Sequence, residues 1–110
     1  MDILNYMNTE GADLYYTTGF RDVLEDHLEL FKAHTGTTTQ AVEPNVAYRF
    51  EYDLGGYLTS LEVPLHLHWL TMRMNGWYSE IEFYNPSVII LPYESYVTRV
   101  KQMYEATTSD

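Results

Sequence analysis

Two histidines, His66 and His68, are the residues of this sequence whose type and spacing most directly suggest chemistry. Imidazole is the commonest side-chain ligand of transition metals, and on a β-strand both rings would lie on one face, where a third group could complete a site. On an α-helix the same rings would diverge by about 200°. The sequence supplies no His-x-x-x-His pair and no helical carboxylate close by. We therefore expect no metal and no cofactor, with one histidine packing or capping and the other exposed.

Carboxylates and serines are the remaining candidates for catalysis. The pairs Glu80/Glu82 and Asp22/Asp26 could exchange protons with a substrate, but nothing near them in the sequence predicts the burial that would shift their pKa values. No serine lies in a Gly-x-Ser-x-Gly motif, and no glycine-rich stretch has the spacing of a phosphate-binding loop. Cysteine is absent, which excludes disulfides, thiol nucleophiles and cysteine-ligated zinc. We therefore expect a protein that is not an enzyme.

The composition narrows the classes of partner. Sixteen acidic residues against six basic ones give a formal net charge of −10. Binding to nucleic acid or to an anionic membrane requires clustered lysine and arginine, and the sequence has no such cluster. Eleven tyrosines are also present, and tyrosine is favoured in protein interfaces because it offers a large contact area with a polar tip. We therefore expect protein partners, and neither nucleic acid nor a membrane.

Length and hydropathy indicate one domain that does not span a membrane. A chain of 110 residues can bury one modest hydrophobic core. The longest uninterrupted apolar run covers only residues 88–91, far short of the roughly 20 residues that cross a bilayer. The first residues, MDILNYMNTEG, lack the basic stretch of a secretory signal, so we expect the chain to be made in a cytoplasm without a cleaved leader.

Residues 1–17 are predicted to form a docking arm outside the folded domain. The segment has no regular helix or strand period, yet it is too apolar for a solvated tail. Burial on a neighbouring subunit would offset the cost of ordering its backbone, about 1–2 kcal/mol per residue. We therefore expect seven side chains to contact a partner protein: Ile3, Leu4, Tyr6, Met7, Leu14, Tyr15 and Tyr16.

The domain itself is predicted to cover residues 18–106 and to begin with an amphipathic helix. Apolar residues recur at helical spacing from Phe20 to Phe31, with Thr18 as the expected N-cap. Gly36 is expected to stop this helix.

Two short strands and a second amphipathic helix are predicted further along. Threonine-rich residues 37–42 favour a strand, and so does the apolar run at 88–91, which lies between two prolines. Residues 93–106 have the apolar spacing of a helix, and residues 107–110 are expected to fray.

Residues 45–84 allow two interpretations. In the first, two hairpins with tight turns at Gly55-Gly56 and Asn75-Gly76 form an antiparallel β-meander, flanked by the two helices. Glycine pairs and Asn-Gly are typical of such turns, and the second hairpin would bring apolar residues into register.

In the second interpretation the same residues are helical. Pro44 would open a helix that breaks near Asp53 and resumes near Tyr57, and a further helix would follow at 64–74. Gly76 would then supply the left-handed residue that ends it. We favour helices because the 64–74 segment contains one β-branched residue and opens with a proline that would interrupt strand pairing.

The resulting order of strand, helix, helix and strand resembles a LysM-type βααβ module. The resemblance rests on "TTTQAVEP" as first strand and turn, "VAYRF" as first helix, "LHWLTMRMNGW" as second helix and "PSVIILP" as last strand. More narrowly, "YRF…D" followed by "LHW…MNG" resembles LysM-like subunits of tailed-phage tails and baseplates. The expected fold is therefore α+β, with an arm, an amphipathic helix, a LysM-like core at about residues 37–92 and a C-terminal helix.

The resemblance also implies a function. It suggests a structural adaptor of a tailed-phage virion, in the tail, neck or baseplate, that contacts other virion proteins in several copies. An alternative is a peptidoglycan- or chitin-binding module, because ordinary LysM modules bind N-acetylated sugars in a shallow groove. By position, that groove would comprise Glu43, Pro44, Asn45, Trp77, Tyr78 and Ser79. A third possibility is an acidic inhibitor that mimics nucleic acid, although the acidic residues are spread along the whole chain.

Overall fold

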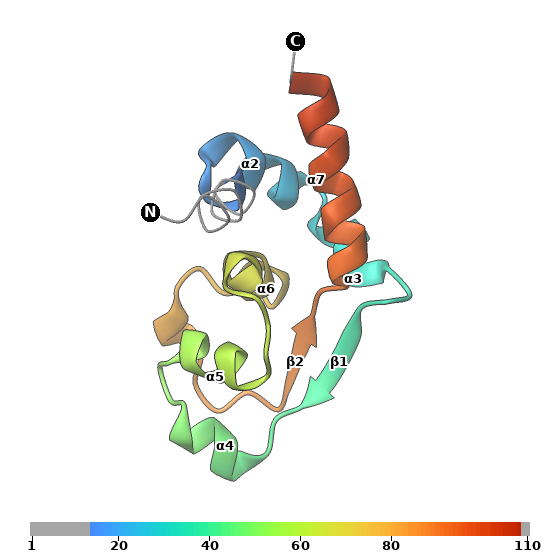
Figure 1. Ribbon diagram of the computed structural model, residues 1–110. Helices are drawn as coiled ribbons and strands as arrows, with labels where there is room; N and C mark the ends of the chain where they lie inside the picture. Colours follow the sequence, from blue (N-terminus) through green and yellow to red (C-terminus); the bar gives the residue numbers. More distant parts are fainter. Residues whose placement is uncertain (1–13, 109–110) are drawn as a thin grey trace, which may run out of the picture.

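The computed structural model describes residues 14–108, and this part of the chain has an α+β fold with far more helix than strand. Figure 1 shows a two-stranded sheet along one side, α6 near the centre, α4 at one end, and α2 with the C-terminal half of α7 at the other. The elements in chain order are η1 (Leu14–Tyr16), α2 (Thr18–Asp26), α3 (Leu28–Ala33), β1 (Thr38–Ala41), α4 (Pro44–Arg49), α5 (Leu54–Ser60), η2 (Leu65–Leu67), α6 (His68–Met74), η3 (Glu80–Glu82), β2 (Val88–Leu91) and α7 (Glu94–Thr108).

The first amphipathic segment forms two helices, α2 and α3, where the sequence predicts one. His27 separates them, and its Nδ1 lies 2.8 Å from the carbonyl oxygen of Val23. The N-cap is Thr17 and not Thr18: Thr17 has an extended backbone and its hydroxyl accepts a hydrogen bond from the backbone N–H of Phe20 at 3.3 Å. Phe20, Leu24 and Phe31 are buried as the apolar spacing predicts.

The middle of the chain is helical, so the β-meander alternative is wrong. Within the described residues, the one sheet pairs β1 with β2 in antiparallel register, from Thr38 opposite Leu91 to Ala41 opposite Val88. Gly76 follows α6 with a φ of 82°, which is the left-handed C-terminal residue that the helical interpretation requires. α5 begins at Leu54, earlier than the expected restart near Tyr57, because the Asp53 carboxylate accepts a hydrogen bond from the Gly56 N–H at 3.0 Å and caps the helix.

The buried residues form two apolar clusters. One lies among α2, α3, α6 and α7, and the other among α4, α5, α6 and β2. Trp69 and Val63 contact both clusters, and each is half-buried. The first cluster comprises Tyr15, Phe20, Leu24, Phe31, Leu67, Leu70, Met74, Val97 and Val100. The second comprises Val42, Ala47, Leu54, Tyr57, Leu58, Met72, Phe83 and Ile89.

Both ends of the expected domain need correction. α7 continues to Thr108, two residues into the segment expected to fray, and the hydroxyl of Thr107 donates to the carbonyl oxygen of Tyr104 at 2.9 Å. At the other end, η1 belongs to the domain and not to a docking arm. Tyr15 is 4% exposed, and its ring packs against Phe20 with centroids 5.3 Å apart.

The sequence pattern could not show this burial, because a three-residue 3-10 helix has no periodic stripe. Of the arm residues, Leu14 packs against the first cluster, and Tyr16 is 48% exposed. Ile3, Leu4, Tyr6 and Met7 lie outside the described residues.

Candidate protein-interaction surface

Three large, exposed side chains lie on α4 and on the two loops beside it. Tyr48, Tyr52 and Tyr84 are 79%, 56% and 57% exposed. We call these three residues the tyrosine face. Helix α4, which carries Tyr48, lies at one end of the molecule, away from the C-terminus (Figure 1). Exposed tyrosines grouped in this way are typical of protein interfaces.

A backbone hydrogen bond and a ring contact hold Tyr52 beside Tyr84. The N–H of Tyr52 donates to the carbonyl oxygen of Phe83 at 2.8 Å, which joins the loop after α4 to the loop after η3. The Tyr52 and Tyr84 rings stack, with centroids 5.6 Å apart and an angle of 14° between their planes. Tyr52 and Asn85 have φ values of 64° and 47°, and the left-handed region is unfavourable for a bulky residue such as tyrosine. Residues held in this conformation concentrate at functional sites.

A hollow of about 250 Å³ lies within this surface. It contains one carboxylate, that of Glu51, and neither lysine nor arginine. Its size falls below the roughly 300–1,000 Å³ of sites for drug-sized ligands, so it suits a single side chain better than a whole small molecule. The lining residues are Pro44, Ala47, Tyr48, Glu51, Tyr84 and Asn85.

A second hollow, of about 360 Å³, lies between α2, α5 and α6 and has a more apolar lining. Arg21 is the cation at its edge: its guanidinium carbon lies 4.9 Å from the centre of the Trp69 ring and 5.8 Å from that of Tyr16. The Arg21 Nε donates to the carbonyl oxygen of Tyr15 at 3.2 Å. The lining residues are Tyr16, Arg21, Leu54, Leu65, His68, Trp69, Met72 and Glu80.

The six groove candidates separate into two groups in the structure. Glu43, Pro44 and Asn45 stand at the start of α4, where Glu43 is the N-cap and Pro44 lines the tyrosine-face hollow. That hollow is completed by Tyr84 and Asn85 and not by the other group. The other group is Trp77, Tyr78 and Ser79, and each of these has an internal role.

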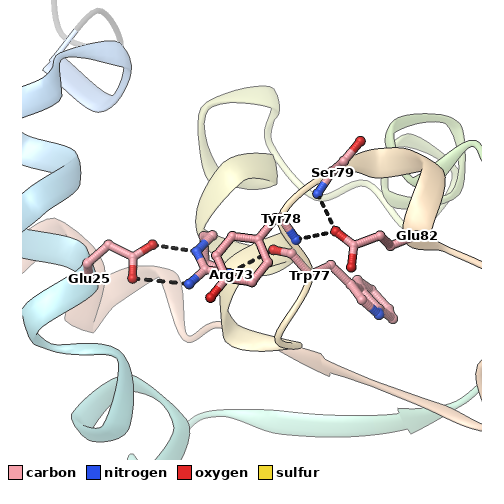
Figure 2. A network of polar contacts seen from close by, with 6 residues as sticks. All are labelled: Glu25, Arg73, Trp77, Tyr78, Ser79 and Glu82. Atoms are coloured by element: carbon pink, nitrogen blue, oxygen red, sulfur yellow. Dashed lines mark hydrogen bonds and ion pairs between the residues drawn. The ribbon is translucent and has the colours of Figure 1, made fainter.

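Figure 2 shows the hydrogen bonds of Tyr78 and Ser79 to Glu82. The Trp77 ring packs edge-on against Phe83 with centroids 5.6 Å apart. Ser79 is the N-cap of η3, and the Glu82 carboxylate accepts from the N–H groups of Tyr78 and Ser79 at 2.6 and 2.8 Å. This reciprocal arrangement is a capping box, so these residues shape the loop and do not form one side of a groove with α4.

Arg73 connects this loop to α2, as Figure 2 also shows. Its guanidinium donates through Nε and Nη2 to the two oxygens of Glu25, the second at 3.2 Å, and through Nη1 to the carbonyl oxygen of Trp77 at 2.9 Å. The Tyr78 ring covers the guanidinium, 4.1 Å from its carbon. The hydrogen bonds to Glu25 raise the pKa of Arg73. Only arginine can make a bidentate pair and stack on a ring at once.

His66 and His68 are both half-buried, so neither is the exposed residue of the expected pair. The ring of His66 lies 4.5 Å from that of Tyr15, and Nε2 of His68 lies 3.0 Å from the carbonyl oxygen of Val63. Among residues 14–108, no three histidine, aspartate or glutamate side chains are grouped as a metal site requires.

Sequence reasoning found the tyrosine abundance but not the tyrosine face. Tyr48 and Tyr52 are four residues apart, a spacing that favours one side of a helix, yet Tyr52 lies in the left-handed turn beyond α4. Tyr84 joins them through a contact across 32 positions of the chain. Its position follows from the Tyr52–Phe83 hydrogen bond, which no local pattern encodes.

No known protein family, curated protein or solved structure matches this chain. Within residues 14–108, every helix is too short or too polar to cross a lipid bilayer. These comparisons therefore give no indication of the function.

Proposed function

We propose that this protein is a non-enzymatic adaptor subunit of a tailed-phage virion, located in the tail, neck or baseplate. It acts through contacts with other virion proteins and is present in several copies in each particle. The phage setting comes from the sequence resemblance to LysM-like tail and baseplate subunits. The mode of action, protein contact, comes from the surface.

The observation that carries this proposal is the tyrosine face. Three exposed tyrosines, two of them with stacked rings, present a large amphipathic area, and interfaces concentrate their binding energy in residues of this kind. The order of elements between β1 and β2 supports the LysM-like resemblance, because helices alone separate two paired antiparallel strands. Helix α5, in the segment "DLGGYLTSLEV", is an addition to a two-helix module.

Purified particles test the proposal directly. Quantitative mass spectrometry of particles should find this chain at a fixed ratio, above one copy per particle, after repeated density-gradient purification. Its presence only in the lysate, with none in the particles, would contradict a structural role.

A sugar-binding module is the second candidate, and one observation favours it. Pro44, which the LysM resemblance assigns to the groove, lines a hollow beside two exposed tyrosine rings, and sugar rings commonly stack on such rings. Incubation with purified cell-wall sacculi separates the two functions. Retention that is lost in the Tyr84→Ser variant would support sugar binding, and passage without retention would support the adaptor.

A further inference from the structure

We propose that the tyrosine face takes an arginine side chain from a basic segment of its partner protein. This inference rests on the proposed adaptor function and specifies the chemistry of the partner. The guanidinium would enter the hollow between Tyr48 and Tyr84 and pair with Glu51.

The negative charge at the tyrosine-face hollow favours a cationic side chain. Glu51 is half-buried at the hollow, and neither lysine nor arginine lines it. The formal net charge of the whole chain is −10, so the general field also attracts basic segments. A carboxylate with restricted access to water gains more from a cationic partner than a fully solvated one.

The aromatic lining selects arginine among the cations. A guanidinium is planar and weakly hydrated, and it can stack on a tyrosine ring while donating two hydrogen bonds to a carboxylate. The same combination occurs elsewhere in this chain, where Arg73 pairs with Glu25 and lies against Tyr78. The volume of the hollow, about 250 Å³, suits one such side chain.

Preorganisation makes the site suitable for binding. The stacked Tyr52 ring supports Tyr84, and the Tyr52–Phe83 backbone hydrogen bond holds both loops in place before any partner arrives. Because the rings of Tyr52 and Tyr84 are already stacked, this pair loses little side-chain entropy on binding.

A second copy of the chain is a less suitable occupant. Two molecules with a charge of −10 repel each other. Of the six basic residues, Lys32, Arg73 and Lys101 pair with carboxylates of their own chain and Arg21 lies against Trp69. Arg49 and Arg99 are exposed, so the case against a second copy rests on the net charge.

The test uses two short peptides that differ only in charge. One has the sequence Ser-Gly-Arg-Ser-Arg-Gly-Ser, and in the other both arginines are replaced by citrulline, which is neutral and nearly isosteric. Each is titrated into the ¹⁵N-labelled full chain and followed by backbone amide shifts. We expect the arginine peptide to shift amides of Tyr48, Glu51 and Tyr84, and to bind at least about fivefold more tightly than the citrulline peptide.

Matched variants locate the interaction. Glu51→Gln should weaken binding of the arginine peptide about fivefold. Asp26→Asn, which removes an exposed charge at the end of α2, should change the affinity less than twofold. Tyr48→Ser should weaken binding by a similar factor to Glu51→Gln. The amide spectrum of each variant shows directly that it is folded. Equal affinities for both peptides, equal effects of the two charge variants, or shifts confined to other surfaces would overturn the inference.

Incorporation into particles separates this inference from the function on which it rests. If Tyr48→Ser with Tyr84→Ser blocks incorporation while the arginine peptide fails to bind, the interface stands and its arginine chemistry is wrong. If the double variant enters particles at the wild-type level, the protein is still a virion component, but the tyrosine face is not its interface and the arginine inference falls. Sedimentation that shows dimers of the chain alone, lost in the double variant, would overturn the choice of partner in favour of a second copy.

Discussion

Arg73 joins two helices and a loop of this fold. It links α6 to α2 through Glu25 and to the following loop through the Trp77 carbonyl, and its side chain is only 12% exposed. Because a half-buried guanidinium with several acceptors leaves unpaired groups when it is removed, its contribution should exceed that of an ordinary surface ion pair.

Replacing Arg73 with Met tests this. The variant keeps much of the side-chain volume but loses every hydrogen bond, and we expect the free energy of unfolding to fall by about 2–3 kcal/mol. Urea denaturation measures the change. The control is Lys32→Met, which removes the more exposed pair with Glu29 on α3 and should cost less than about 1 kcal/mol. Equal effects of the two substitutions would show that Arg73 is not a structural link.

His66 should make the stability depend on pH. Burial lowers its pKa from the usual value of 6.5, and this effect exceeds the opposing attraction of Glu94. The folded protein therefore favours the neutral ring, so the contribution to stability is fully present above about pH 6.5 and is lost as the pH falls toward the lowered pKa.

Comparison of wild type with His66→Gln isolates this residue. Between pH 7.5 and pH 5, the wild type should lose more stability than the variant, because glutamine does not titrate. Urea melts at several pH values provide the measurement. Parallel pH profiles for the two proteins would show that His66 is not perturbed by its surroundings.

At the scale of elements, η1 is where sequence and structure differ most. The sequence shows apolar residues without a period, and such a pattern does not distinguish a segment that packs on its own domain from one that docks elsewhere. Tyr15 and Tyr16 resolve the question, since one is 4% exposed and its neighbour 48%.

These adjacent tyrosines provide a matched pair of substitutions. Tyr15→Ala should reduce the free energy of unfolding by about 3 kcal/mol, because it leaves a cavity beside Phe20 and Leu67. Tyr16→Ala should reduce it by less than about 1 kcal/mol. Thermal or urea unfolding measures the effect of each substitution. A small effect of Tyr15→Ala would mean that η1 is not part of the domain core, as the docking-arm prediction holds.

The end of α6 was predictable, because Asn-Gly has a clear local meaning once the helix is recognised. Gly76 has a φ of 82°, and a Cβ atom there would meet nothing within 4 Å. Gly76→Ala should therefore cost only the left-handed strain, about 1–2 kcal/mol. A stability equal to wild type in urea unfolding would argue against this helix end.

Composition predicts the type of the element at residues 64–74 but not the exact ends of the other helices. The scarcity of β-branched residues at 64–74 correctly favoured a helix over a hairpin. The break at His27 and the early start of α5 depend on single hydrogen bonds, to the Val23 carbonyl and from the Gly56 N–H. The spacing of apolar residues does not reveal single hydrogen bonds of this kind.

For the whole molecule, Trp69 and Val63 join two apolar clusters into one core, and α4, which carries Tyr48, lies at one end. The tyrosine face needs residues from two loops that are distant in the sequence. The eleven tyrosines therefore indicate a protein interface, but the sequence does not show where on the molecule the tyrosine face lies.

Site-specific photo-crosslinking tests the central claim that this face is the protein interface of an adaptor. A photoreactive phenylalanine analogue, p-benzoylphenylalanine, is placed at Tyr48 in one preparation and at Leu30, an exposed residue of α3, in another. Irradiated particles should contain a crosslink from position 48 to another virion protein and none from position 30. Absence of a crosslink from position 48, or equal crosslinking from both positions, would contradict the account.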